Sequence, residues 1–209
     1  MKAKSTTTIP AFSILGPPGC GKGTQAKLIQ ERLGYVHVSS GDIFRHAIAR
    51  EDPNALKVQD LMKRGELVPD EIIKDMVEKE LSELIEQNKN LHGFILDGFP
   101  RTVGQAELLD SIAEDLNLRF IGMVNLNVPE PVLIERLLER GKGAEQRPDD
   151  NEEVIRARMK VYDDKTFPLI SYFTKRNQLV NVDGVGDVEE IYNRLVPILE
   201  DLEKHPLMA

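Results

Sequence analysis

The sequence predicts an α/β protein built on a doubly wound parallel sheet of five strands. Short apolar runs of four to seven residues alternate with longer segments in which apolar residues recur at positions i, i+3, i+4 and i+7. The short runs are continuously apolar, which is typical of strands that helices cover on both faces. A chain of 209 residues is long enough to bury a sizeable core and fits one domain with small insertions.

Five apolar runs are expected to form the strands. They are residues 11–15, 35–38, 93–96, 120–126 and 178–182. The first leads through a glycine-rich turn into a helix around residues 27–33. Residues 39–68 are expected to insert two or more helical segments between the second and third strands, and residues 140–150 to form a polar loop between two helices.

Three amphipathic helices are expected in the second half of the chain. The first has its apolar residues at 132–138 and follows Pro129, which suits a helix start. The second has them at 154–162 and follows residues 149–151, a run rich in N-cap candidates. The last carries an apolar stripe over 188–199. These helices complete the alternation that predicts the fold class.

The charge balance limits the partners that we expect. The chain has 27 Lys and Arg against 35 Asp and Glu, a formal net charge of -8, which disfavours a general nucleic-acid or membrane-surface binder. No window approaches the ~18–20 consecutive apolar residues of a transmembrane helix, and the N-terminus lacks a secretory pattern. The single Cys20 cannot form an intramolecular disulfide. We therefore expect a cytoplasmic protein.

A phosphate-binding loop follows the first strand. Residues 16–24, Gly-Pro-Pro-Gly-Cys-Gly-Lys-Gly-Thr, match the spacing G-x-x-x-x-G-K between a strand and a helix. The glycines let backbone N–H groups curl around phosphate oxygens, and the helix N-terminus adds donors and a dipole that favours anions. Lys22 is placed to reach the terminal phosphates. The alternative is a glycine-rich turn that binds no ligand.

The position after this lysine departs from the usual pattern. Gly23 stands where a Mg²⁺-binding Ser or Thr is common, and Thr24 follows one place later. This disfavours a GTPase switch and implies that other groups help to hold Mg²⁺. Asp97 is the candidate, because it ends an apolar strand at the usual place of the second acid of a phosphate site. A turn or N-cap aspartate is the alternative.

Four motifs occur in order along the chain. They are residues 16–24, 39–45 (Ser-Ser-Gly-Asp-Ile-Phe-Arg), 97–101 (Asp-Gly-Phe-Pro-Arg) and 147–150 (Arg-Pro-Asp-Asp). Together they resemble the nucleoside monophosphate kinases, and most of all the adenylate kinase family, from about residue 12 to 199. The resemblance implies reversible, Mg²⁺-dependent transfer of the terminal phosphoryl group of ATP to AMP. That reaction needs positioning and charge neutralisation rather than a general base, so we expect the four histidines to be structural or surface residues.

The resemblance implies a set of catalytic cations. They are Lys22, Arg101, Arg136, Arg140, Arg147 and Arg158. Lys22 and Arg140 would hold the triphosphate, and Arg136 would lie over its adenine. Arg147 and Arg158 would clamp the transferring group.

The spacing of these arginines leaves alternatives open. Arg136 and Arg140 are four residues apart on one helix face, where like charges cost ~0.2–0.5 kcal/mol that a bound anion could relieve. An ordinary solvated charged face is the alternative. On the next helix, Arg156 is an equal candidate to Arg158 when spacing alone is considered.

The binding residues implied by the resemblance fall into three groups. Those for ATP are Gly16, Gly19, Cys20, Gly21, Lys22, Gly23, Thr24, Arg136, Arg140 and Gly186. Those for AMP are Ser40, Arg45, Glu66, Leu67, Val68, Gly98, Phe99, Pro100, Arg101, Gln105, Arg147 and Arg158. Asp97 would hold Mg²⁺ through water.

Selection of the acceptor base rests on two positions. By the resemblance, Ser40 stands at the position where adenylate kinases have Thr and uridylate/cytidylate kinases have Ala. Gln105 stands where adenylate kinases carry the Gln that binds the adenine edge, because an amide can donate to a ring nitrogen and accept from the exocyclic amine. The alternative for Gln105 is a plain helix N-terminal residue. We expect AMP as acceptor, with a UMP/CMP kinase or another nucleoside monophosphate kinase as the alternative.

The resemblance also implies the organisation of the chain. A single kinase domain over residues 1–209 would contain an AMP-binding insertion at 39–68 and a short lid at 140–150. This lid has neither the length nor the cysteines of a zinc-bearing form, so we expect no structural zinc. We expect a monomer whose partners are ATP and AMP. A non-catalytic P-loop nucleotide-binding protein is the rival from another class, which a second set of arginines disfavours.

Overall fold

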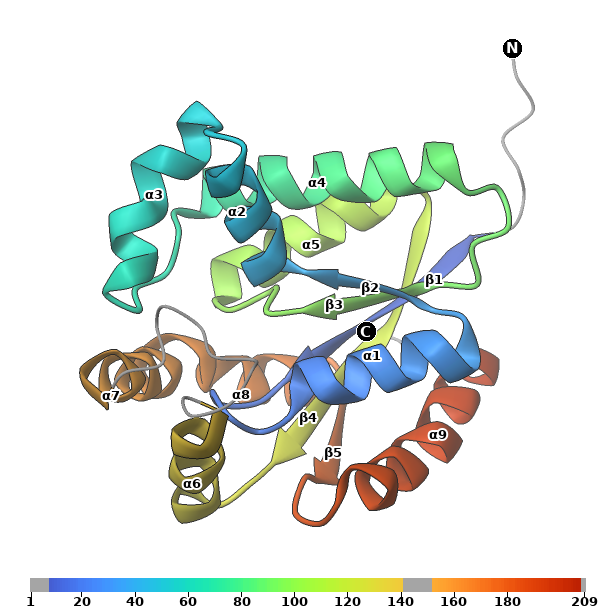
Figure 1. Ribbon diagram of the computed structural model, residues 1–209. Helices are drawn as coiled ribbons and strands as arrows, with labels where there is room; N and C mark the ends of the chain where they lie inside the picture. The colour runs from blue at the N-terminus through green and yellow to red at the C-terminus, as the bar shows by residue number, and fades with distance from the viewer. Residues whose placement is uncertain (1–7, 141–151, 208–209) are drawn as a thin grey trace.

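A five-stranded parallel sheet forms the centre of the molecule (Figure 1). A computed structural model of the chain describes residues 8–140 and 152–207. The strands are β1 (Ile9–Leu15), β2 (Val36–Ser39), β3 (Phe94–Asp97), β4 (Leu118–Asn127) and β5 (Leu179–Asp183). Their order across the sheet is β2-β3-β1-β4-β5, and all neighbouring pairs are parallel. The predicted fold class is confirmed, and each strand end lies within two residues of its predicted position.

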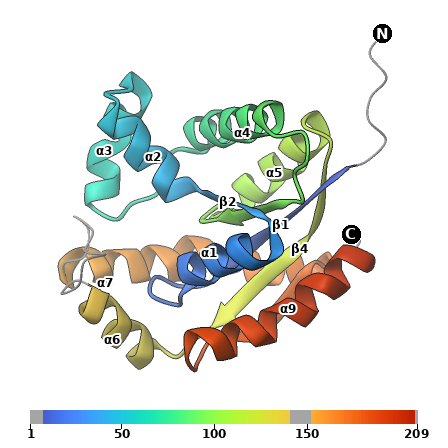
Figure 2. The same cartoon turned by 45° about the vertical axis from the view of Figure 1, so that its right-hand side comes forward.

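Helices cover both faces of this sheet (Figures 1 and 2). One face carries α1 (Lys22–Leu33) and α9 (Val188–Lys204). The other carries α4 (Asp70–Gln87), α5 (Val103–Asp115) and α8 (Pro168–Lys175). The sheet is therefore wound on both sides, as the sequence predicts.

Strand β3, which lies between β2 and β1, shows why the strands are continuously apolar. Phe94 and Leu96 pack into the core on the side of α4 and α5, while Ile95 packs into the core on the side of α1 and α9. All three side chains are buried. Because successive side chains of a strand point to opposite faces, a strand covered on both faces needs apolar residues at every position.

The insertion between β2 and β3 is helical, as expected. It contains α2 (Ser40–Ala49) and α3 (Pro53–Lys63), and the chain then enters α4. The Ser39 hydroxyl caps α2 by accepting from the Asp42 backbone N–H. Phe44 of α2 and Val58 of α3 are buried in the same core as α4, which attaches the insertion to one end of the sheet.

The second half of the chain contains the three expected helices. They are α6 (Glu130–Arg140), α7 (Glu152–Val161) and α9, and α6 begins directly after Pro129. The apolar pattern of 154–162 does not continue as one α-helix, because the chain passes at Tyr162 into a π-helical turn, η1 (Tyr162–Thr166). The expected N-cap run 149–151 and lid residues 141–150 lie outside the described residues. None of the described helices is long and apolar enough to cross a membrane.

Helix α1 begins five residues earlier than predicted, at Lys22 instead of 27. Gly21 precedes it with a φ of 98°, in the left-handed region that glycine adopts without a Cβ clash. This conformation turns the chain directly from the loop into the helix. Lys22, Gly23 and Thr24 therefore lie in the first helical turn, beside its unpaired backbone N–H groups.

Candidate active site

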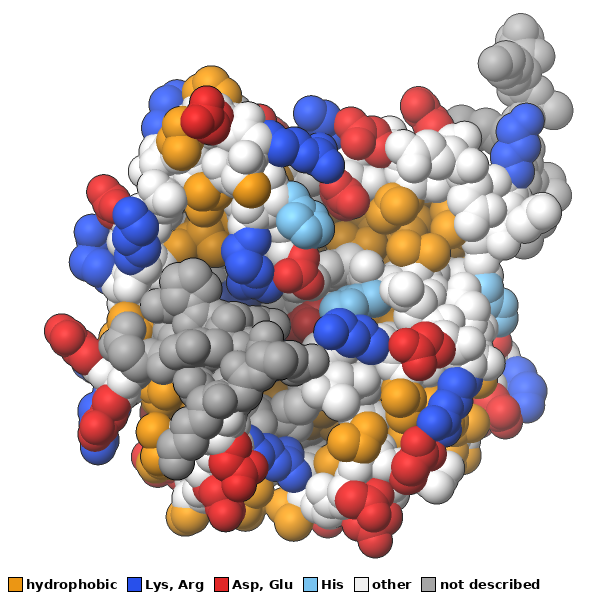
Figure 3. All heavy atoms as spheres, in the orientation of Figure 1, with side chains coloured by type: hydrophobic (Ala, Val, Ile, Leu, Met, Phe, Trp, Pro, Cys, Tyr) orange, Lys and Arg blue, Asp and Glu red, His pale blue; other side chains and the backbone are white. Residues whose placement is uncertain are grey.

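Three chain segments meet at the carboxyl edge of the sheet. Asp97, the last residue of β3, pairs in register with Ile14 of β1 and with Ser39 of β2. The loop after β1, the turn after β3 and helix α2 after β2 therefore start at one level. A cavity of about 760 Å³ opens between them. Basic, acidic and histidine side chains gather at this hollow, between α1 and the helices above it (Figure 3).

Most of the predicted site residues line this cavity. They are Gly16, Gly19, Gly21, Lys22, Gly23, Thr24, Arg45, Glu66, Leu67, Asp97, Gly98, Pro100, Arg101, Arg136, Arg158 and Gly186. A smaller pocket of about 50 Å³ shares Gly98 and Arg101 with it and is also lined by Ser40, Val68 and Gln105. The side chains of Cys20 and Phe99 are buried in the core, so contacts to a ligand fall to their backbone. The Arg140 side chain and Arg147 lie outside the described part of the chain.

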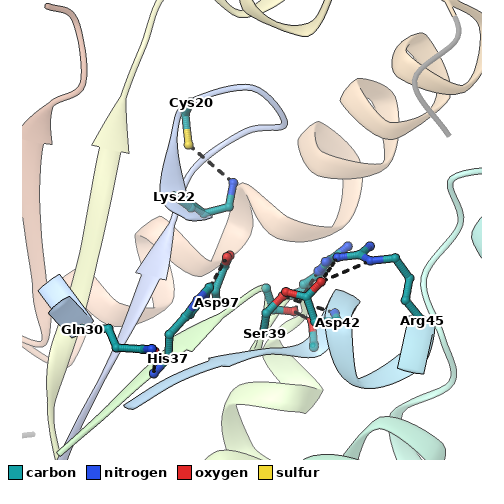
Figure 4. A network of polar contacts seen from close by, with 11 residues as sticks. Cys20, Lys22, Gln30, His37, Ser39, Asp42, Arg45 and Asp97 are labelled. Atoms are coloured by element: carbon teal, nitrogen blue, oxygen red, sulfur yellow. Dashed lines mark hydrogen bonds and ion pairs between the residues drawn. The ribbon is translucent and has the colours of Figure 1, made fainter. Parts of the chain in front are cut away.

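The phosphate loop holds its lysine over its own backbone. Lys22 Nζ donates to the Gly16 carbonyl at 2.7 Å and to the Pro17 carbonyl at 3.0 Å, and lies 3.4 Å from Cys20 Sγ (Figure 4). The Cys20 thiol fills the space above Gly16, where an added Cβ would lie 2.6 Å from Sγ. Carbonyl contacts orient the ammonium group without neutralising its charge.

Asp97 faces the start of α1 across the cavity. A Cβ added at Gly23 would lie 3.6 Å from Asp97 Oδ2, and this oxygen lies 3.2 Å from His37 Nε2 (Figure 4). Burial acts to raise the pKa of Asp97, but the hydrogen bond from His37 and the charges of Lys22 and Arg101 outweigh burial and lower it. Asp97 is therefore held as a carboxylate.

The donor set at Asp97 fits a magnesium ion that keeps most of its water. Within residues 8–140 and 152–207, no three His, Cys, Asp or Glu side chains come together to form a metal cluster. Mg²⁺ is commonly bound through one or two carboxylates together with waters and substrate phosphates. An ionised carboxylate next to a phosphate loop has this character.

The opposite wall of the cavity is built around Gly98. Its carbonyl accepts from Ser40 Oγ at 2.7 Å and from Arg101 Nε at 2.8 Å. Gly98 has a φ of 75°, and an added Cβ would lie 2.7 Å from both the Ser40 hydroxyl and the Arg101 guanidinium. Only glycine allows the two side chains to approach the same carbonyl. Arg45 lies nearby on α2 and bonds Asp42 Oδ1 at 2.5 Å.

Arginines from α6 and α7 close the remaining sides. Arg136 donates to the carbonyls of Gly184 at 3.1 Å and Gly186 at 3.4 Å. Arg158 lines the cavity. Arg156 instead bonds Glu152 at 2.8 Å on the exposed face of α7, so the structure separates two arginines that spacing alone leaves equivalent.

Several residues that line the cavity are not predicted from the sequence. The sequence predicts that His37 is a structural or surface residue, but it contacts Asp97 inside the cavity. Asp42 pairs with Arg45 there, and its place in the 39–45 motif was an available signal. Tyr162 and Thr166 come from the π-helical turn, and burial raises the pKa of Tyr162. Such turns are frequent at functional sites but have no clear sequence signature.

Comparison with known protein sequences finds relatives over most of the length of the chain. The family model described as adenylate kinase matches residues 14–178. The chain is 44% identical to an adenylate kinase of Thermus thermophilus over 185 residues, which cover 88% of this chain and 94% of that protein. It is 44% identical to one of Nocardia farcinica over 186 residues, 89% and 97% of the two chains. With one of Xanthomonas campestris it shares 43% identity over 182 residues, 87% and 95% of the two chains.

The lowered pKa of Asp97 predicts a specific pH dependence of stability. An unfolded Asp titrates near ~3.9. The extra stability of a carboxylate with a lower folded pKa is fully present above that value and is lost as the pH falls through the folded pKa. The difference in unfolding free energy between wild type and Asp97→Asn should therefore not vary with pH near neutrality. As the pH falls into the acid range, wild type should lose stability relative to Asp97→Asn. Urea titrations from neutral pH to pH 2 measure it.

Asp75, an exposed carboxylate on α4, provides the matched control. The difference in unfolding free energy between wild type and Asp75→Asn should change less over the same pH range. If Asp97→Asn and Asp75→Asn follow the same curve, the interaction of Asp97 with its cationic neighbours is not the cause.

Replacement of Gly98 should damage both the fold and the site. Gly98→Ala places a Cβ at a left-handed φ and within 2.7 Å of Ser40 and Arg101. We expect the free energy of unfolding to fall by about 1–3 kcal/mol. Ser40→Ala removes the hydrogen bond to the Gly98 carbonyl without straining the backbone, so it should lower the free energy of unfolding by less. Urea denaturation of both variants tests this, and an equal loss would contradict the role of strain.

Proposed function

The chain belongs to the adenylate kinase family, and we propose that its 760 Å³ cavity carries the reversible transfer of the terminal phosphoryl group of ATP to AMP, giving two ADP. It is a phosphotransferase of the nucleoside monophosphate kinase class. One observation carries the proposal: the cavity has cationic groups on two walls. The phosphate loop with Lys22 forms one wall, and Arg45 with Arg101 forms the other. A protein that only bound one nucleotide would have no use for the second wall.

The donor nucleotide would bind at the phosphate loop. The N–H groups in the first turn of α1 have no helical partners, so they can donate to phosphate oxygens together with the helix dipole. Lys22 would exchange its two carbonyl contacts for phosphate oxygens, which form stronger, charge-assisted bonds. Arg136 and the Gly186 carbonyl would meet the adenine of ATP, and Arg140 would join Lys22 on the triphosphate.

The acceptor would bind at the other wall. Arg45 and Arg101 would hold the phosphate of AMP, one of whose oxygens is the nucleophile. A phosphate monoester has its second pKa near ~6, so at neutral pH this oxygen is already largely ionised and no protein base has to remove a proton. Arg158, together with Arg147, would neutralise charge on the group in transfer. The protein's contribution is alignment and charge compensation.

Magnesium would be held at Asp97, through water. When bound, it would supply positive charge that compensates the charge of the phosphate oxygens. Asp97 itself is fixed by His37, which orients its carboxylate towards the loop. The lowered pKa keeps Asp97 ionised over the pH range in which nucleotides are fully charged.

AMP is favoured as acceptor by the small pocket beside Gly98. Gln105 and Ser40 line it, with Leu67 and Val68 from the segment after α3. Gln105 has an amide that can donate to a ring nitrogen and accept from an exocyclic amine. We also propose that 39–68 is the AMP-binding segment, that 140–150 is a short lid, and that the protein works as a cytoplasmic monomer without structural zinc.

Steady-state assays with four acceptors test the assignment. With ATP and Mg²⁺ present, AMP should give a higher kcat/KM than UMP, CMP or GMP, measured by coupled detection of ADP. Faster turnover of UMP or CMP would assign the chain to another nucleoside monophosphate kinase activity. ATP binding without AMP-dependent ADP formation would favour a non-catalytic nucleotide-binding protein.

Arg158 and Arg156 form a matched pair on one helix. Arg158→Ala should lower kcat by at least about 100-fold, since a guanidinium facing the transferring group is lost from the transition state. Arg156→Ala removes the same charge from the exposed face and should leave kcat within about twofold, as exposed ion pairs contribute little. Equal effects of the two changes on kcat would remove Arg158 from the catalytic set.

A further inference from the structure

We propose that Asp70 is a positioning residue that fixes the amide orientation of Gln105 and thereby makes the acceptor pocket select 6-aminopurines over 6-oxopurines. This inference rests on the proposed function, because it concerns the base of the acceptor. Asp70 is the first residue of α4, and Gln105 lies in the first turn of α5. Gln105 is buried, with 2% of the residue exposed, and it lines the small pocket.

Both ends of the Gln105 amide have a partner in the protein. Nε2 donates to Asp70 Oδ1 at 2.8 Å, and Oε1 accepts from the Arg101 backbone N–H at 2.8 Å. A carboxylate can only accept, and a backbone N–H can only donate. Turning the amide over would place oxygen against oxygen at Asp70 and donor against donor at Arg101. The two partners therefore allow one orientation, which follows from hydrogen-bond chemistry rather than from atom assignment.

The fixed orientation leaves one hydrogen on Nε2 and one lone pair on Oε1 for the base. Adenine offers the matching pair, an acceptor at N1 and a donor at its 6-amino group. A 6-oxopurine offers the reverse, a donor at N1–H and an acceptor at O6, which would require the amide to turn over. A site whose buried polar groups match one edge rejects the edge that leaves them unpaired.

A substitution at Gly104 provides a second way to disturb the Asp70 carboxylate without replacing Asp70. A Cβ added at Gly104 would lie 2.9 Å from Asp70 Oδ2, the end of a side chain that can move away. Gly104 has an ordinary helical conformation, so Gly104→Ala should fold, with a gain in helix propensity. It displaces the Asp70 carboxylate while keeping its charge.

The test compares acceptor discrimination in wild type and three variants. KM and kcat for AMP are measured, together with the inhibition constant of inosine monophosphate, a 6-oxopurine nucleotide, against AMP. In Asp70→Ala, we expect the ratio of this inhibition constant to the KM of AMP to fall by roughly tenfold, with a smaller change in kcat. Gly104→Ala should lower the same ratio. Glu71→Ala, which removes the neighbouring exposed carboxylate of α4, should keep it.

The outcomes separate this inference from the proposed function. If folded Asp70→Ala keeps the wild-type ratio, or loses kcat alone, Asp70 has no part in base selection and the inference is wrong. If Asp70→Ala does not fold, Gly104→Ala decides, and an unchanged ratio in that variant overturns the inference. Failure of wild type to form ADP from AMP would instead refute the proposed function.

Discussion

The parallel register of β2, β3 and β1 is the constraint on which the site depends. Asp97 pairs with both Ser39 and Ile14, so the three strands reach the carboxyl edge together. The phosphate loop, α2 and the turn at Gly98 leave the sheet at that level and have to share the same space. A shift of β3 by one residue would turn Asp97 to the opposite face and move Gly98 away from Ser40. The two walls of the cavity are thus set by backbone pairing.

An acidic chain can carry a cationic cavity because backbone carbonyls orient several of the cations there. Lys22 and Arg136 donate to backbone carbonyls, which orient their side chains without neutralising them, and Arg101 also donates to a carbonyl, that of Gly98. Ordering these long side chains is part of folding, so a nucleotide would not have to order them on binding. Arg45 differs, because it pairs with Asp42, and a phosphate would have to compete with that carboxylate. The net charge of -8 describes the whole chain and not this cavity.

What could be predicted from the sequence was encoded locally. Continuous apolar runs identify strands covered on both faces, and the glycine spacing with Lys22 identifies the phosphate loop. The contact of His37 with Asp97 could not be found this way, since it depends on the register between β2 and β3. The bond from Gln105 to Asp70 joins residues 35 positions apart on two helices. The π-helical turn interrupts an apolar period that itself gives no sign of ending at Val161.

Arg101 connects the two tasks of the acceptor wall. Its backbone N–H holds the oxygen of Gln105, and its guanidinium is tied to the Gly98 carbonyl and faces the main cavity. One residue would therefore fix the distance between the contact to the base and the contact to the phosphate. Two loops that move separately would not fix this distance. Ser40 bonds the same Gly98 carbonyl, so α2 is fixed to this turn as well. Phosphoryl transfer tolerates little displacement of the reacting atoms. Because one turn would bind both the base and the phosphate of the acceptor, the phosphate would be correctly aligned for transfer only when the correct base is bound.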